Sequence, residues 1–333
     1  MPTRSQVSRV LFGITLSTGL LYLLLRNVSP AELLFHLGRT YWRWLALSAA
    51  LNLAMLWARG FRWGWLFYPA RQSGWPLVSA TTIGFMANNV LPLRMGELVR
   101  GYLAARSGGL SFWTALATLA VERALDMLSI LLVLGAVVFT VPVPPWLQAG
   151  ALTFLALDLL AMGLLIFLAR GRGAVAGWIT RLPRFGETVT RWLALFATGL
   201  QSLGRGPHLV PLVGWTLLIW TLNAGSVWAA LRAGGLALPS SAPLTVLAFA
   251  GIGVSIPSAP GFIGTLHFFV VQALAIYAVT GAEAVSVSFI YHAAGYVPVT
   301  LLGWALLMTR GVSLWEASRE ARAQAQSSSS PSP

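Results

Sequence analysis

Two segments interrupt the long apolar runs of this chain with proline and glycine, and they constrain its fold more than any other feature. The first covers residues 85–100 and the second covers residues 250–264. Backbone groups that leave a helix at membrane depth must be buried in protein or face a water-filled cavity. The first segment also carries polar and charged side chains, namely Asn88, Asn89, Arg94, Glu97 and Arg100. Both segments are therefore expected to do more than connect helices.

Composition places the chain in a membrane. It is 57% hydrophobic and only 9% charged, whereas about 25% of the residues in soluble domains are charged. Apolar runs long enough to cross ~30 Å of hydrocarbon recur, and the alternating pattern of an outer-membrane barrel is absent. The net charge of +13 comes from arginines in short loops, which indicates the positive-inside bias and not nucleic-acid binding. We predict an all-α integral membrane protein.

Six apolar stretches predict full membrane spans. They lie at about residues 7–25, 41–59, 112–140, 146–169, 209–231 and 284–309. Arginines assign the stretch 59–75, the segment 170–208 and both termini to the cytoplasm. The loop 26–43 also carries arginines, but the span count places it outside.

This span count agrees with the loop assignments only if residues 76–106 and 243–280 each enter and leave the membrane on the same face. We expect two opposed re-entrant helical hairpins, the first from the cytoplasm and the second from the exterior. They would belong to inverted repeats at about 1–141 and 146–311, within a single transmembrane domain of residues 1–311. Inverted repeats that meet at the midplane are a transporter architecture. The alternative is that proline and glycine only kink ordinary spans. Residues 312–333 predict a disordered cytoplasmic tail.

Charged side chains cluster after the first break and on the next span. Arg94, Glu97 and Arg100 are three residues apart, and Glu122 and Asp126 share one helix face beside Arg123. Ionisable groups inside a membrane are costly and face a partner or a wet cavity. Two interpretations stay open. The groups form a buried network that fixes the hairpin to the span, or the arginines bind phosphate with their bidentate forks.

The backbone of the breaks has its own candidates. Asn89 lies where Pro92 frees backbone groups, and Gly96 is a further backbone candidate of this first break. In the second segment Pro257, Pro260 and Gly264 shape the turn. A helix that begins near Gly261 would point its N–H groups at the midplane, which favours an anion but is also what any tight turn needs. The polar candidates beside that turn are Ser258, Gly261, Thr265 and His267.

Histidine and enzyme motifs give weaker signals. His267 and His292 either titrate near neutral pH or serve as structural hydrogen-bond partners. No glycine-rich phosphate loop with lysine, nucleophile elbow, or metal-ligand spacing is found, and cysteine is absent. We therefore expect no cofactor, no metal and no catalytic residue.

The two motifs together resemble the lysylphosphatidylglycerol synthase transmembrane-region family, also called flippase-like. The resemblance covers nearly the whole chain. It rests on Asn89-x-x-Pro92-x-Arg94-x-Gly96-Glu97-x-x-Arg100, on Glu122-Arg123-x-x-Asp126, and on Ile256-Pro-Ser-Ala-Pro-Gly-Phe-Ile-Gly-Thr265. It implies a membrane module that handles lipids, similar to the part of the two-domain members that moves an aminoacylated phospholipid between leaflets. Stand-alone members also resemble proteins linked to polyprenyl-lipid and glycolipid pathways, so the substrate stays open. The sequence ends in a Ser/Pro-rich tail without an aminoacyl-transferase domain, so synthase activity is not expected.

The main functional hypothesis is a lipid translocase with alternating access to a polar groove. Arg94, Arg100 and Arg123 would hold an anionic or phosphate-bearing headgroup, and Glu97, Glu122 and Asp126 would hold those arginines between cycles. One alternative is an enzyme or enzyme subunit in polyprenyl-phosphate or glycolipid metabolism, with Glu97 or Asp126 as base. Another is a scaffold that binds a lipid-modifying enzyme through segment 170–208. We expect a prokaryotic cytoplasmic (inner) membrane location with both termini in the cytoplasm.

Overall fold

All elements in the described part of the chain are helical, which confirms the predicted all-α class. The structure, a computed structural model, describes residues 4–67, 72, 74–92, 95–108, 111–141, 206–256, 258–310 and 313–327, with isolated positions between 145 and 163. Four helices are long and apolar enough to cross a membrane, namely α3 (Trp42–Trp65), α6 (Phe112–Thr140), α10 (Gly206–Ala233) and α13 (Gly281–Met308). The chain is a multi-pass membrane protein.

The spans agree with the sequence except at three places. The predicted first span is α1 (Arg4–Leu25), which continues into α2 (Pro30–Gly38) through a bend of 88° between the two helices. The predicted span 146–169 lies mostly outside the described residues. Helix α3 continues to Trp65, past the predicted end at residue 59. Arg59 and Arg62, on the predicted stretch 59–75, therefore lie inside a helix, and their placement in a loop was wrong.

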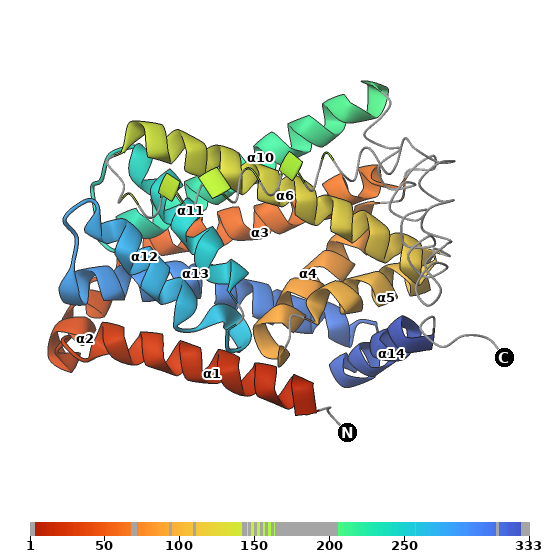
Figure 1. Ribbon diagram of the computed structural model, residues 1–333, viewed down its shortest axis with the longest axis horizontal. Coiled ribbons are helices and arrows are strands. Elements are labelled where there is room, and N and C mark those ends of the chain that lie inside the picture. The colour runs from red at the N-terminus through yellow and green to blue at the C-terminus, as the bar shows by residue number, and fades with distance from the viewer. Residues whose placement is uncertain are drawn as a thin grey trace.

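Each broken segment is a helical hairpin. The first consists of α4 (Gly74–Val90) and α5 (Gly96–Gly108), which pack against each other. The second consists of α11 (Ser241–Ser255), the short helix η2 (Pro260–Phe262) and α12 (Thr265–Ala275). In Figure 1 the first hairpin lies toward one end of the bundle and the second toward the other.

The open ends of the two hairpins lie at opposite ends of α13. Just after α13, Arg310 donates hydrogen bonds to Ser79 and Pro76 near the start of α4, and to Ser107 near the end of α5. Just before α13, the Tyr277 hydroxyl bonds Ser241 and Thr245 at the start of α11, at 3.0 and 2.8 Å. Both ends of each hairpin are thus held together on one side of the bundle.

The tips of the hairpins meet against the middle of α13. The Tyr296 hydroxyl donates to the Asn89 carbonyl at 3.4 Å, and the Asn89 amide donates to Thr300 at 2.9 Å. Gly261 has a φ of +70°, and a Cβ there would lie 2.7 Å from the Tyr296 ring and 3.4 Å from the Asn89 oxygen. Glycine is needed at this position for its backbone conformation and for the close approach.

The expected disordered tail is instead largely a helix, α14 (Leu314–Ser327). Leu314, Ala317 and Ala321 are buried in the core cluster that includes the first hairpin, and α14 packs on α5. Ser313 and Glu316 form a capping box at its start, with hydrogen bonds of 3.0 and 3.1 Å. The Ser313 backbone N–H holds the pKa of Glu316 below its usual range. An apolar face at helical spacing explains why this segment folds.

Because the first hairpin is closely packed, we predict that a glycine-to-alanine substitution inside it lowers the free energy of unfolding more than one on α6. A Cβ at Gly96 would overlap the Gly84 carbonyl and lie 2.5 Å from Asn88 Oδ1, whereas a Cβ at Gly135 on α6 meets nothing within 4 Å. Gly96→Ala should lower the free energy of unfolding by about 1–3 kcal/mol because of overpacking. Gly135→Ala should leave it unchanged or raise it by up to ~1 kcal/mol. Denaturant unfolding in mixed micelles measures both, and equal stabilities would contradict the hairpin packing.

Candidate functional site

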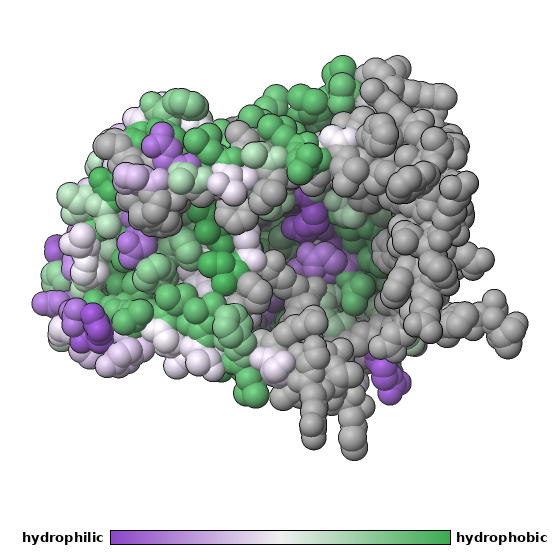
Figure 2. All heavy atoms as spheres, in the orientation of Figure 1, coloured by the Kyte–Doolittle hydropathy of each residue, from purple (hydrophilic) through white to green (hydrophobic). Residues whose placement is uncertain are grey.

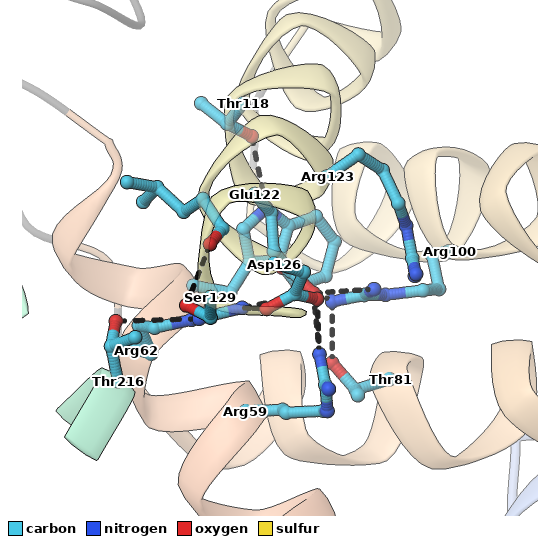
Figure 3. A network of polar contacts seen from close by, with 12 residues as sticks. Arg59, Arg62, Thr81, Arg100, Thr118, Glu122, Arg123, Asp126, Ser129 and Thr216 are labelled. Carbon is cyan, nitrogen blue, oxygen red and sulfur yellow. Dashed lines mark hydrogen bonds and ion pairs between the residues drawn. The ribbon is translucent and has the colours of Figure 1, made fainter. Parts of the chain in front are cut away.

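Two acidic side chains on α6, Glu122 and Asp126, organise a charged network between four helices (Figure 3). They are one helical turn apart and both are buried, with exposed fractions of 0% and 5%. Their arginine partners come from α3 and α5. Burying such carboxylates is costly unless each is paired and hydrogen-bonded, so the partners must lie at the same depth.

Asp126 is held by the two arginines at the end of α3. Arg59 Nη1 donates to Oδ2 at 2.5 Å and Arg62 Nη2 donates to Oδ1 at 2.7 Å. Arg62 also lies 3.7 Å from Glu122 Oε1 and donates to Thr216 on α10 at 3.4 Å. Neither arginine is among the site residues predicted from the sequence, because arginine near a span end suggests a loop. Their i, i+3 spacing in the last turns of α3 was the available signal.

Glu122 receives a bidentate pair of hydrogen bonds from Arg100 on α5, at 3.1 and 3.0 Å. Arg100 also donates to Thr81 on α4 at 3.0 Å, and its guanidinium lies 4.5 Å from the centroid of the Trp63 ring. The Arg100 side chain is only 1% exposed. Arg100 thus pairs with Glu122, and Asp126 pairs with the arginines of α3. Pairing of this kind is what a network that fixes the hairpin to the span requires.

Glu97 and Arg123 form the accessible edge of this network. Arg123 Nη2 lies 3.4 Å from Glu97 Oε1, and the two side chains are 42% and 30% exposed. Asn88 donates to Glu97 at 3.4 Å while its own oxygen accepts the Gly96 N–H at 2.7 Å. Figure 2 shows hydrophilic atoms at the floor of a hollow near the middle of the molecule, in the region of α4, α5 and α6. Arg94 lies outside the described residues.

The network has an excess of positive charge. Within the described residues four arginines face three carboxylates, which gives 4 − 3 = +1; they are Arg59, Arg62, Arg100, Arg123, Glu97, Glu122 and Asp126. Buried Nε atoms of Arg62, Arg100 and Arg123 have no hydrogen-bond partner in this part of the chain. The arrangement is therefore suited to hold one additional anionic group.

The candidates of the second hairpin form a separate, uncharged set. Ser17 on α1 accepts the Ala259 N–H at 2.9 Å, and a Cβ at Gly264, where φ is +93°, would overlap the Ser17 carbonyl. Thr265 begins α12 and donates to Phe262 at 3.3 Å. Ser258 Oγ is buried with no partner among the described residues. Pro257 lies outside them. His267 is buried and bonds His292 at 3.0 Å.

Asp126 is buried and Glu97 is half-exposed, so we predict that removing their charges lowers the free energy of unfolding by different amounts. Asp126→Asn leaves Arg59 and Arg62 short of negative charge in the interior and should lower the free energy of unfolding by about 3–5 kcal/mol. Glu97→Gln, at the half-exposed edge, should cost less than ~1 kcal/mol. Denaturant titration of the purified protein in mixed micelles checks both values. Similar losses for the two variants would mean that the network is not organised around Asp126.

Known proteins resemble this chain over most of its length. The chain is 23% identical to a protein named glycosyltransferase AglD of Haloferax volcanii over 96% of its own length, but it spans only 58% of that protein. It is 25% identical to a UPF0104 membrane protein of Methanothermobacter thermautotrophicus, covering 88% of this chain and 91% of the relative. The family described as "Lysylphosphatidylglycerol synthase TM region" matches residues 10–303. Since that match covers most of the chain, the protein belongs to the lysylphosphatidylglycerol synthase TM region family.

Proposed function

We propose that the protein moves a phosphate-bearing lipid between the two leaflets of a membrane. The observation that carries this proposal is the half-exposed Glu97–Arg123 pair, at the edge of a network with one excess positive charge. It lies beside the break of the first hairpin, between residues 90 and 96. Membership of a family named for the membrane region of a lipid synthase supports a lipid as the substrate.

The proposal places both hairpins in the membrane as re-entrant elements of two inverted repeats. Its support is that the open ends lie at opposite ends of α13 and that the tips meet near Asn89 and Gly261. Together with a crossing within 146–169, this gives the six spans predicted from the sequence. We propose that the end that holds Arg310, with both termini, faces the cytoplasm of a prokaryotic inner membrane; the basic residues at that end support this orientation.

In the proposed mechanism a headgroup phosphate takes the place of Glu97 on Arg123. A guanidinium binds phosphate as readily as carboxylate, through two parallel hydrogen bonds. Glu97 retains Asn88 as a hydrogen-bond donor after the exchange. Arg94, next to the break, is a predicted further ligand. Arg100 stays with Glu122 and Thr81 and holds the frame.

This site would lower the main free-energy barrier to lipid movement, which is the passage of the charged headgroup through the bilayer. A charge at the bilayer centre costs about 3 kcal/mol, and more without local hydration. The acyl chains remain in the bilayer, so the protein need shield only the headgroup. With no ATP-binding motif in the sequence, the driving force would be a gradient. The membrane potential supplies about 2.3 kcal/mol per charge for each 100 mV.

A second candidate is a membrane enzyme, or part of one, that acts on polyprenyl-phosphate or glycolipid substrates. It is favoured by the name of the relative glycosyltransferase AglD. The chain spans only 58% of that protein, so its activity does not carry over. In this alternative the half-exposed Glu97 is the general base. A dependence of product formation on a sugar donor, in purified protein, separates it from translocation.

The translocation hypothesis predicts the effect of removing one arginine. Arg123→Gln should slow lipid movement at least about tenfold, since hydrogen bonds to a charged group contribute ~1.5–3 kcal/mol. The measurement is loss of fluorescence from labelled phosphatidylglycerol in proteoliposomes after quenching of the outer leaflet. Arg39→Gln is the matched control, because Arg39 is exposed at the end of α2, and it should keep the wild-type rate. Equal rates for both folded variants would exclude Arg123 as a headgroup ligand.

A further inference from the structure

A buried pair of histidines joins the second hairpin to α13 and has no role in the mechanism above. His267 on α12 is 1% exposed, and its Nε2 lies 3.0 Å from Nδ1 of His292 on α13. His267 Nδ1 lies 3.3 Å from Ser288 Oγ. His292 also packs edge-on against Tyr296, the ring that a Cβ at Gly261 would meet at the tip of the hairpin. The pair therefore connects the hairpin tip with the helix that both hairpins share.

The hydrogen bonds fix where the protons of the neutral pair lie. Ser288 Oγ donates to the Val285 carbonyl at 2.6 Å, so it must accept from His267 Nδ1. A neutral imidazole has one donor and one acceptor nitrogen. His267 Nε2 is then the acceptor and receives its hydrogen bond from His292. A proton added to His267 Nε2 would face the N–H of His292 at 3.0 Å and break the contact.

In the described part of the chain, no charge close to the pair compensates an added proton. Among the described residues α4, α11 and η2 carry no charged side chain. Other titratable or charged residues lie on the remaining elements that pack against α12 and α13, on these two helices themselves, or directly after α12. They are Arg4, Arg9, Tyr22, Glu32, His36, Arg39, Arg43, Arg59, Arg62, His208, Arg232, Tyr277, Glu283, Tyr291 and Tyr296. Arg59 and Arg62 are paired with Asp126. The ring neighbours of the pair are uncharged, with Phe289 4.3 Å from His267 and Tyr296 5.3 Å from His292. An imidazolium without a counter-charge in such a site is costly.

We propose that His267 and His292 form a proton-binding site that fills only when α12 separates from α13, so that acid favours an open position of the second hairpin. The closed pair takes up no extra proton, whereas the separated, hydrated imidazoles do. Lower pH therefore shifts the equilibrium toward the open state. If the protein is a lipid translocase, the pair supplies its coupling ion; that role rests on the proposed function, while the opening itself does not.

The size of the effect follows from ordinary imidazole chemistry. A hydrated histidine titrates near a pKa of ~6.5. If one imidazole takes up a proton on opening, the ratio of open to closed molecules rises about tenfold between pH 7.5 and 5.5 by linkage. Uptake by both imidazoles would give about a hundredfold.

Because the chain has no cysteine, a single introduced thiol can report the opening. Ser258→Cys places it at the hairpin tip, where the Ser258 oxygen is buried. Ser29→Cys, on the exposed residue before α2, corrects for the intrinsic pH dependence of thiol reactivity. The measurement is the rate of modification by a water-soluble maleimide in liposomes between pH 7.5 and 5.5. We expect the rate at Ser258→Cys, relative to Ser29→Cys, to rise about tenfold in acid.

Substitutions of histidine by glutamine identify the groups responsible. In the Ser258→Cys background His267→Gln and His292→Gln should each reduce the rise and the double substitution should abolish it, whereas His36→Gln on α2 should keep it. If His267→Gln does not fold, as judged by gel filtration, His292→Gln decides. A flat pH profile in the wild-type background, or an undiminished rise in His292→Gln, would overturn the proposal. Labelling needs no lipid substrate, so failure of lipid transport would contradict the proposed function without touching this result.

Discussion

Glu122 and Asp126 on α6 hold three other helices at fixed depth through the arginines that neutralise them. In an apolar interior a carboxylate without a partner costs several kcal/mol, so Arg59 and Arg62 must bring the end of α3 to Asp126, and Arg100 must bring α5 to Glu122. Thr81 extends the same connection to α4. The break between α4 and α5 follows from this requirement, because a continuous helix would carry Arg100 away from Glu122. The buried charged residues thus mainly hold the helices together. The proposed ligand site lies at the edge of this network, where Glu97 and Arg123 reach the surface of the helix bundle.

The two hairpins are held by different forces. Ion pairs fix the first, while the second depends on close backbone contacts and neutral hydrogen bonds. Gly264 lies directly against the Ser17 carbonyl of α1, Gly261 lies against Tyr296, and His267 bonds His292. Neutral hydrogen bonds of this kind are individually weaker than hydrogen bonds to charged groups. In the proposed cycle the first hairpin therefore stays fixed and carries the headgroup site, and the second hairpin moves.

Much of this could be predicted from local patterns. The bounds of α6, the shared face of Glu122 and Asp126, and the two breaks were all readable from apolar periodicity and proline. Arg59 and Arg62 were not, because the rule that places arginine in cytoplasmic loops cannot recognise an arginine whose counter-charge lies more than sixty residues away. The helix α14 was missed although Leu314, Ala317 and Ala321 have helical spacing; the polar composition of the tail obscured it. The contact of His267 with His292 depends on how α12 packs on α13, which no local pattern determines.

The central claim is that each hairpin enters and leaves the membrane on one side, and that the two sides are opposite. Single cysteines introduced into the cysteine-free chain test it most directly, by labelling of intact cells and of inverted vesicles with a membrane-impermeant maleimide. Gln72→Cys and Ser111→Cys flank the first hairpin, and Ser240→Cys and Thr280→Cys flank the second. We predict that the first two react only from the cytoplasmic side and the last two only from the exterior. Reaction of the two positions that flank one hairpin from different sides would show that this hairpin spans the membrane, and would contradict the opposed arrangement on which the proposed function depends.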